Sequence, residues 1–249
     1  MSETRSDRSP ALLPAEGFQT MSVTVTGAAG ALGRATVAAY LAAGARRVAA
    51  LDRDTDALAH AFGGDDRVAA VACDLTDDAA AREGFARAAA LAGPPDAVAA
   101  IAGGFAMGPA VHETEEDLWE RMQALNVTTL RHTLTAVVPG MVERGRGAIV
   151  TVGAAGAVKG QAGMGAYIAA KSTVMRLTEA ASAELRSKGV NVNAVLPSII
   201  DTPANRQAMP NADPAKWVTP QDLAAVILFL TSPAARAIHG ALVPVVGLS

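Results

Sequence analysis

The chain has 249 residues, of which 51% are hydrophobic and 18% are charged, a composition that excludes fibrous and intrinsically disordered proteins. Its 24 acidic and 21 basic residues give a formal charge of −3, which argues against a general nucleic-acid binder. Cys73 is the single cysteine, so an intrachain disulfide and a cysteine-based zinc or iron–sulfur cluster are excluded.

In chain order, short apolar runs alternate with alanine-rich stretches of helical character. The apolar runs predict seven strands, over residues 22–26, 47–51, 68–73, 97–102, 147–152, 190–196 and 242–246. The stretches between them predict helices, over residues 31–43, 54–62, 77–91, 114–141 and 166–186 and from residue 220 onward.

Hydroxyl-bearing residues mark three of the predicted helix starts. Thr76 is expected to cap the helix over 77–91. Thr114 and the acidic residues after it predict a capping box for the helix over 114–141. Thr219 followed by Pro220 predicts an N-cap with proline at the first helical position. Three prolines interrupt residues 201–219, which we expect to be a lid segment without a long element.

The alternation of strands and helices predicts a single α/β domain over residues 21–249. Strands that are continuously apolar are typical of a sheet buried on both faces. We therefore expect a Rossmann-type, doubly wound sheet of about seven mostly parallel strands, with helices on both faces. Ligands of such sheets bind beyond the carboxyl ends of the strands.

Residues 1–20 are polar, mixed in charge and carry two prolines, and they lack the apolar core of a secretory signal. We expect a flexible N-terminal arm. No apolar run reaches the roughly 18 residues that span a bilayer. These observations predict a cytoplasmic protein that does not contact membranes.

A glycine-rich turn follows the first predicted strand, with Gly27, Gly30 and Gly33 spaced three apart. Such a turn lets backbone N–H groups and a helix N-terminus approach a pyrophosphate. Asp52 ends the second strand 19 residues after Gly33, where an acid meets the ribose hydroxyls of a dinucleotide. The alternative is that Asp52 only caps the next helix. A carboxylate there favours NAD(H), and Arg53 beside it keeps NADP(H) open.

Tyr167 and Lys171 lie four residues apart near the start of a predicted helix, so both side chains share one face. An ammonium beside a phenol is expected to lower the phenol pKa from near 10 toward working pH. The phenol can then exchange a proton with a carbonyl oxygen while a nicotinamide supplies hydride. The alternative is an ordinary surface pair.

Several short motifs occur in one order along the chain. They are TGAAGALG after the first strand, Asp52, Asp74-Leu75, Ala102-Gly103-Gly104, Asn126, Tyr167-x-x-x-Lys171 and the segment PSIIDT from Pro197. In these motifs the chain resembles the short-chain dehydrogenase/reductase family from about residue 20 to its C-terminus. The resemblance implies that Tyr167 is the general acid and base, that Lys171 holds the ribose and tunes Tyr167, and that Asn126 orders a proton-relay water.

The resemblance also implies a set of cofactor contacts. Besides Tyr167 and Lys171, these are Gly27, Gly30, Ala31, Leu32, Gly33, Asp52, Arg53, Asp74, Leu75, Ala102, Gly103, Pro197, Ile200 and Thr202. It further implies a homodimer or homotetramer that pairs through the helices around 117–141 and 167–186.

Two positions depart from the family pattern. Ala31 stands where the family has its middle glycine, and Ala154 stands where the family has its catalytic serine, thirteen residues before Tyr167. Losing one donor to the substrate oxygen typically costs about 10²–10³ in rate. The missing serine, together with Ala102-Gly103-Gly104-Phe105, resembles the serine-deficient branch of dihydropteridine reductase. Asn126 is not expected in that branch.

The resemblance points to a pocket for a small-molecule substrate lined by Gly104, Phe105, Ala154, Arg206, Met209 and Trp217. Arg206 would anchor a polar substituent, and Met209 and Trp217 would contact a flat ring; the alternative is that Met209 and Trp217 only pack the lid onto the body.

We therefore expect an NAD(P)-dependent oxidoreductase acting on a carbonyl, quinone-like or pterin-like substrate. Dihydropteridine reductase proper is one alternative. A catalytically silent NAD(H)-binding sensor or partner subunit is another, and a methyltransferase would leave the tyrosine–lysine pair unexplained. The four histidines lack metal-ligand spacing, so no metal site is expected.

Overall fold

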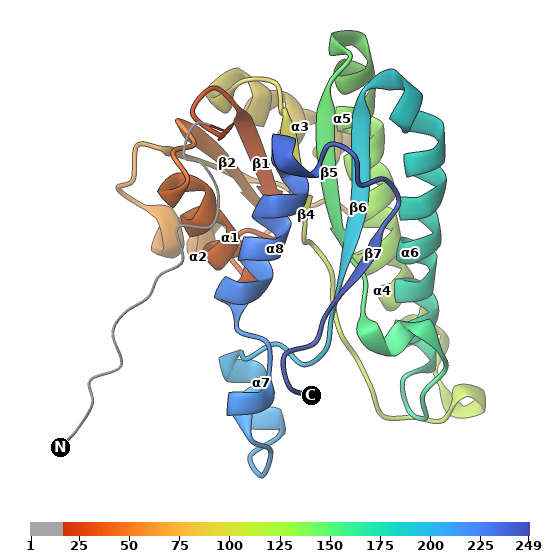
Figure 1. Cartoon of the computed structure of the whole chain (residues 1–249). Helices are drawn as coiled ribbons and strands as arrows, with labels where there is room; N and C mark the ends of the chain where they lie inside the picture. Colours follow the sequence, from red (N-terminus) through yellow and green to blue (C-terminus); the bar gives the residue numbers. More distant parts are fainter. Residues whose placement is uncertain (1–16) are drawn as a thin grey trace, which may run out of the picture.

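Seven strands form one parallel sheet in the computed structural model, which describes residues 17–249 (Figure 1). They are β1 (Ser22–Thr26), β2 (Arg47–Asp52), β3 (Val68–Ala72), β4 (Ala97–Ala100), β5 (Gly147–Val152), β6 (Val190–Pro197) and β7 (Leu242–Val245). The helices are α1 (Ala31–Ala42), α2 (Thr55–Phe62), α3 (Asp78–Ala92), α4 (Glu116–Gln123), α5 (Thr129–Arg144), α6 (Gly165–Leu185), α7 (Pro203–Ala208) and α8 (Pro220–Thr231). The predicted single α/β domain with a doubly wound sheet is confirmed.

The sheet has the order β3-β2-β1-β4-β5-β6-β7, and every neighbouring pair is parallel. The central strands are buried on both faces; Ile149 and Val150, neighbours in β5 whose side chains point to opposite faces, are both buried. This burial explains the continuous apolar runs in the sequence, because neither face of these strands alternates with solvent.

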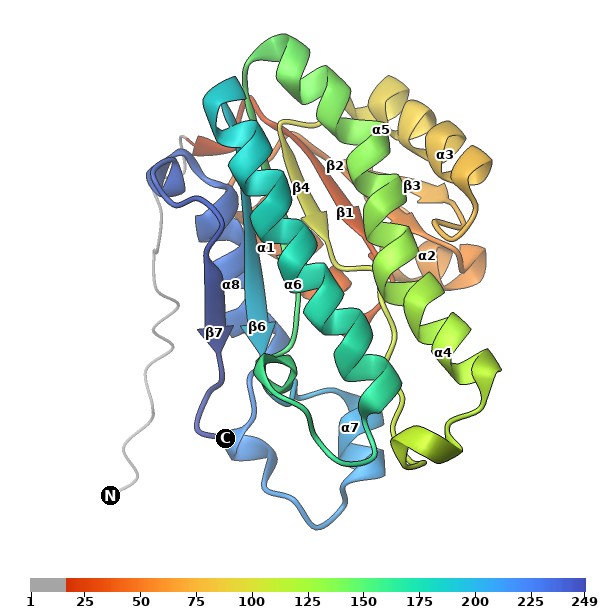
Figure 2. The same ribbon diagram turned by 90° about the vertical axis from the view of Figure 1, so that its right-hand side faces the viewer.

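Helices cover both faces of the sheet. Figure 1 shows α1 and α8 together on one face, and Figure 2 shows α4, α5 and α6 across the other. A buried hydrogen bond of 2.7 Å between the Tyr40 and Thr231 hydroxyls joins α1 to α8. The two apolar layers that result flank the sheet on either side.

The chain reverses its direction of winding between β1 and β4, which are neighbours in the sheet although β2 and β3 separate them in sequence. The loops after these two strands therefore diverge to opposite faces. Such a switch point opens a crevice at the carboxyl ends of the strands, and α7 lies beyond that end of the sheet (Figure 1).

Two predicted helix starts are wrong. Asp77, not Thr76, caps α3, and its Oδ1 accepts from the Ala80 N–H at 2.7 Å. Thr114 makes no capping box, because its hydroxyl donates to the Ala110 carbonyl and α4 begins after Glu115. The Thr219 cap of α8 is confirmed, and its Oγ1 accepts from the Asp222 N–H at 3.0 Å.

The helix predicted over 114–141 is divided. A π-helical turn over Ala124–Thr128 separates α4 from α5. Single π-helical turns inside helices often lie at functional sites, and this turn carries Asn126.

The expected N-terminal arm ends earlier than residue 20. Phe18 is buried against the Tyr40 ring, with a centroid separation of 5.3 Å, so residues 17–20 belong to the folded domain. The rest of the arm lies outside the described residues. Within residues 17–249, none of the helices combines the length and the apolar character needed to cross a bilayer.

Candidate active site

The turn between β1 and α1 is shaped by two glycines. Gly27 has a φ of +63°, which favours glycine. A Cβ on Gly33 would overlap the Gly27 carbonyl oxygen and lie 2.6 Å from the Ala28 Cα. α1 then begins at Ala31, and no described side chain caps it or places an acid in its first turn. Its first N–H groups are therefore available to an anion.

A cleft of about 590 Å³ opens beside this turn, a size within the usual range for small-molecule sites. Most of the expected cofactor contacts line it. These are Gly27, Gly30, Ala31, Leu32, Gly33, Asp52, Arg53, Asp74, Leu75, Ala102, Gly103 and Thr202. Four expected contacts do not line it, namely Tyr167, Lys171, Pro197 and Ile200, whereas Gly104 of the expected substrate pocket does. The uncapped helix N-terminus at one end of the cleft and the carboxylates along it fit the pyrophosphate and ribose of a dinucleotide.

Asp52 ties the second strand to the glycine-rich turn. Its Oδ2 accepts from the Ala29 N–H at 3.0 Å, and its Oδ1 accepts from the Asp54 N–H at 3.3 Å. The capping role for the next helix belongs to Asp54, whose Oδ1 accepts from the Ala57 N–H at 2.9 Å. Asp52 is thus held in place with its carboxylate at the wall of the cleft.

Asp74 and Leu75 form the neighbouring wall. The Thr76 hydroxyl and N–H both donate to Asp74 Oδ1, at 2.7 and 2.8 Å, and these bonds hold the pKa of the Asp74 carboxyl below its usual range. Leu75 is buried, and its carbonyl oxygen lies 2.9 Å from Nδ1 of His132.

Asn126 fixes the loop that follows β4. Its Oδ1 accepts from the Gly104 N–H, and its Nδ2 donates to the Gly104 carbonyl, each at 3.1 Å. Nδ2 also donates to the Met122 carbonyl at 3.0 Å. The side chain therefore holds the backbone of this loop, and the expected ordering of a water by Asn126 stays a prediction.

Lys171 lies behind the same loop. A Cβ on Gly103 would stand 3.2 Å from Lys171 Nζ and 2.8 Å from Asn126 Oδ1, so only glycine lets the cleft wall approach the ammonium this closely. Nζ donates to the Val152 carbonyl at 2.8 Å. A cavity of about 10 Å³ adjoins it, lined also by Thr26, Thr129, Thr133 and Thr151, and this is close to the space one water needs.

Tyr167 lies one helical turn before Lys171 and is partly buried. Phe105 packs on its ring edge to face, with centroids 4.9 Å apart and planes at 78°. Burial raises the pKa of Tyr167 to about 12 and lowers the pKa of Lys171 to about 8. The expected lowering of the phenol pKa by Lys171 is therefore wrong for this structure, because burial of the phenol raises its pKa.

The two tyrosines should therefore ionise late. Burial raises the pKa of Tyr40 even more than that of Tyr167, whereas unfolded tyrosines ionise near pH 10. At about pH 11 we expect the native protein to show little tyrosinate absorbance. The denatured protein should show the absorbance of two ionised tyrosines at that pH. The stability that the neutral phenols contribute is complete below about pH 10 and is lost as the pH rises toward 12. Circular dichroism at each pH checks that the fold persists, and ionisation of one native tyrosine near pH 10 would contradict the burial argument.

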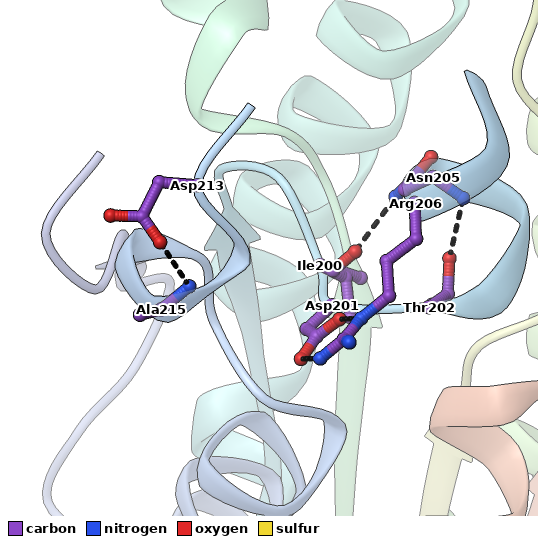
Figure 3. A network of polar contacts seen from close by, with 7 residues as sticks. All are labelled: Ile200, Asp201, Thr202, Asn205, Arg206, Asp213 and Ala215. Carbon is purple, nitrogen blue, oxygen red and sulfur yellow. Dashed lines mark hydrogen bonds and ion pairs between the residues drawn. The ribbon is translucent and has the colours of Figure 1, made fainter. Parts of the chain in front are cut away.

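The segment 201–219 is built from local contacts, as Figure 3 shows. Thr202 caps the short helix α7, and Asn205 Nδ2 donates to the Ile200 carbonyl at 2.8 Å. Arg206 donates to both carboxylate oxygens of Asp201, at 2.6 and 2.7 Å. Asp213 caps the following turn at Ala215. The segment has no long element, as expected.

Three residues of this segment differ from the roles expected of them. Arg206, expected to anchor a substrate, is exposed and paired with Asp201. Trp217 is buried, with 6% of its surface exposed, which fits the alternative that it packs the lid onto the body. Met209 is partly buried, and none of the three lines the cleft.

Ala154 stands beside Tyr167 within an apolar cluster. It is buried together with Ala157, Ile168 and Met175, and Tyr167 packs against this group. No hydroxyl is available at this position to hydrogen-bond a substrate oxygen.

Eight residues of the cleft were not predicted from the sequence. They are Ala29, Asp54, Ala57, Cys73, Thr76, Ile101, Leu125 and Thr129. The first six lie within five residues of a predicted contact, after the carboxyl ends of β1, β2 and β3 and at that of β4, so extending each motif by a few positions would have found them. Leu125 and Thr129 come from the π-helical turn and α5, for which the sequence offered no signal besides Asn126.

Comparisons with known proteins agree on one family. Residues 21–213 match the family model described as short chain dehydrogenase. A short-chain dehydrogenase/reductase from Burkholderia thailandensis is 38% identical, with a TM-score of 0.81 over 92% of each chain. A 3-ketoacyl-(acyl-carrier-protein) reductase from Brucella melitensis, solved with NADH, is 26% identical, with a TM-score of 0.84 over 92% of this chain and 98% of that chain.

The curated relatives match over shorter segments. The protein named inactive 2-(S)-hydroxypropyl-CoM dehydrogenase 2 from Xanthobacter autotrophicus is 36% identical over 158 residues, which are 58% of this chain and 69% of that protein. Across such relatives the matched segments span between 48% and 69% of the relative's length.

Proposed function

The chain belongs to the short-chain dehydrogenase/reductase family, and from this premise we propose that it is an NAD(P)-dependent oxidoreductase acting on a carbonyl, quinone-like or pterin-like substrate. One observation carries the proposal: the cleft of about 590 Å³ runs from the uncapped start of α1 to Gly103, directly in front of Lys171 Nζ. A dinucleotide laid along the cleft would bring its reactive end to the Tyr167–Lys171 face of α6.

Residues of the cleft suit the parts of that cofactor. The N–H groups of Ala31, Leu32 and Gly33 would bind the pyrophosphate, and Asp52 would accept from the ribose hydroxyls. The Thr202 hydroxyl oxygen accepts from the Asn205 N–H at 3.2 Å, which leaves its proton to donate to a ligand. When bound, the reduced nicotinamide supplies a hydride.

Tyr167 would donate the proton in the direction of reduction. A phenol whose pKa is about 12 is protonated at working pH, and so it can donate to the oxygen of a carbonyl whose carbon receives the hydride. The substrate gains two electrons and the cofactor loses them, while the phenol regains its proton from solvent. Lys171, with a pKa of about 8, can gain and release a proton near neutral pH.

The charges in the cleft favour NAD(H) over NADP(H). Asp52, Asp54 and Asp74 line it, and among residues 17–249 Arg53 is the one cation that does. A carboxylate held at the ribose repels a 2′-phosphate. We expect NADH to bind at least about tenfold more tightly than NADPH, a difference of about 1.4 kcal/mol.

Asp52→Asn tests this preference, because the amide oxygen still accepts from the Ala29 N–H while the charge is lost. In fluorescence titrations, the ratio of the NADH affinity to the NADPH affinity should fall toward one. Asp56→Asn on the exposed part of α2 removes the same charge away from the cleft and should leave the ratio unchanged. An unaltered ratio in Asp52→Asn would show that another group selects the cofactor.

The alanine at position 154 favours an activated acceptor. Without a second hydrogen-bond donor to the substrate oxygen, a quinone-like or pterin-like ring that is easily reduced needs less help than a simple ketone. Dihydropteridine reductase proper is the narrower form of this proposal.

Ala154→Ser should raise kcat/KM for simple ketones by about 10²-fold, because it restores one donor at the substrate oxygen. Ala157→Ser is the matched control, since Ala157 is buried in the same cluster. It should give no gain in the same steady-state assay. If Ala154→Ser also gives none, the pocket is built around a substrate that does not use this donor.

Ala154 also favours a second candidate function, a catalytically silent NAD(H)-binding sensor or partner subunit. Purified protein, NADH and a panel of quinonoid dihydropterin, ortho-quinones and activated ketones separate the two. NADH oxidation with any acceptor supports the enzyme. NADH binding without turnover on any acceptor supports the silent protein, and absence of binding contradicts both.

A further inference from the structure

Exposed apolar side chains gather beside Tyr167. Eight large apolar side chains are exposed among residues 17–249, and four of them belong to the two loops that follow β4 and β5. These four, which we call the apolar rim, are Phe105, Met107, Val111 and Val158, with 56%, 63%, 62% and 70% of their surface exposed. Clustered exposed apolar residues often mark a ligand-binding groove.

The two loops meet at the start of α6. The Gly108 N–H donates to the Gly163 carbonyl at 2.8 Å, and a Cβ on Gly165 would lie 2.8 Å from Val111 Cγ2. Figure 2 shows the loop leading into α4 and the loop leading into α6 at the same end of the molecule. The turn that carries Val158 is tied to α6 as well, because the Ser172 hydroxyl donates to the Ala157 carbonyl at 2.9 Å.

The rim is continuous with the proposed cofactor cleft. Gly103 and Gly104 line the cleft, and Phe105, the next residue, packs on the Tyr167 ring. A molecule whose carbonyl reaches the Tyr167 hydroxyl from the mouth of the cleft would therefore lay its carbon skeleton against the rim.

The stretches of these loops that carry the rim contain no charged or hydrogen-bonding side chain. Residues 101–111 (IAGGFAMGPAV) and 152–158 (VGAAGAV) contain no charged, hydroxyl or amide side chain. Arg206, the cation expected to face the substrate, is paired with Asp201. Lys159, the first charged residue after the second segment, is exposed, as are His112 and Glu113, which follow the first segment and lie 3.8 Å from each other. An anionic substituent would lose its hydration here without gaining a partner, which is costly.

We propose, on the basis of the proposed function, that the substrate is a neutral carbonyl compound with an apolar aryl or alicyclic skeleton, and that Phe105 is its main contact. Burial of such a skeleton against the rim supplies binding energy in proportion to the apolar area removed from water. Small hydroxylated or anionic carbonyl compounds gain nothing from this surface.

Acetophenone and 4-acetylbenzoate test the proposal, because they share a skeleton and differ in one carboxylate. We expect acetophenone to have a kcat/KM at least about tenfold higher in the NADH-dependent reduction. Phe105→Ala should lower kcat/KM for acetophenone about 10–200-fold, mainly through KM. It should lower kcat/KM for 2,3-butanedione, which is too small to reach the rim, by a smaller factor, because both substrates use the Tyr167 ring on which Phe105 packs. Lys159→Ala should change none of these values.

Binding measurements keep this test separate from the test of the proposed function. Ligand-observed NMR in the presence of NAD⁺ should show acetophenone bound to the wild type and weakened at least about tenfold by Phe105→Ala, whether or not it is reduced. Equal or tighter binding of 4-acetylbenzoate, with loss on Lys159→Ala, would overturn the proposed substrate class. Turnover of 2,3-butanedione without preference for acetophenone would overturn it too and leave the oxidoreductase standing. Acetophenone binding without turnover of any carbonyl would support the class and contradict the enzyme.

Discussion

Replacing Tyr167 by Phe should lower kcat for carbonyl reduction about 10²–10⁴-fold while NADH affinity changes by less than about threefold. The effect is this large because the hydroxyl is the proposed proton donor, and general acid catalysis typically contributes this much. The ring itself remains, so its edge-to-face contact with Phe105 is kept. Single-turnover measurement of NADH oxidation, together with NADH fluorescence titration, separates the chemical step from cofactor binding.

Tyr40→Phe is the matched control, because it removes the same hydroxyl from the chain's other tyrosine. Tyr40 is fully buried, and its hydroxyl bonds Thr231 between α1 and α8. Losing that buried bond should reduce stability by about 1–3 kcal/mol and leave kcat unchanged. If Tyr167→Phe retains wild-type kcat, the proton comes from another group and the proposed mechanism is wrong.

Gly33→Ala should lower NADH affinity at least about 100-fold, which corresponds to about 2.8 kcal/mol. The added Cβ would overlap the Gly27 carbonyl oxygen and crowd the Ala28 backbone, so the turn that presents the first N–H groups of α1 has to move. The neighbouring backbone cannot yield as a flexible side chain would. NADH fluorescence titration gives the affinity.

Gly160→Ala makes the same chemical change where the structure has room. No atom lies within 4 Å of a Cβ at this exposed position, so NADH affinity and the melting temperature should match the wild type. A melting curve of Gly33→Ala with a single cooperative transition would show that the loss of affinity is local. Wild-type affinity in Gly33→Ala would mean that the cofactor does not bind at this turn.

The sheet was largely predictable because its strands are short apolar runs bounded by turns. The predicted bounds of β1 and β5, residues 22–26 and 147–152, match the structure. The Thr219–Pro220 start of α8 was predictable too, since a cap and an N1 proline are local signals. Most contacts of the cleft followed from one rule, that ligands bind after the carboxyl ends of parallel strands.

Features that depend on tertiary contacts were not predictable. The π-helical turn at Asn126 forms where its side chain bonds Gly104, 22 residues away. The pairing of Arg206 with Asp201 depends on the path of the backbone over residues 201–206. The pKa of Tyr167 is raised by burial. The spacing of Tyr167 and Lys171 in the sequence does not show how deeply this face of the helix is buried.

The adjacency of β1 and β4 also bears on synthesis by the ribosome. Between the end of β1 at Thr26 and the start of β4 at Ala97 lie 97 − 26 = 71 residue steps, which take roughly 4–14 s at about 5–20 residues per second. During that interval β1, which is buried in the folded sheet, has an open edge in the nascent chain. Strand edges of this kind recruit other chains, so we expect yield in a cell-free system to depend on holdase chaperones early in translation.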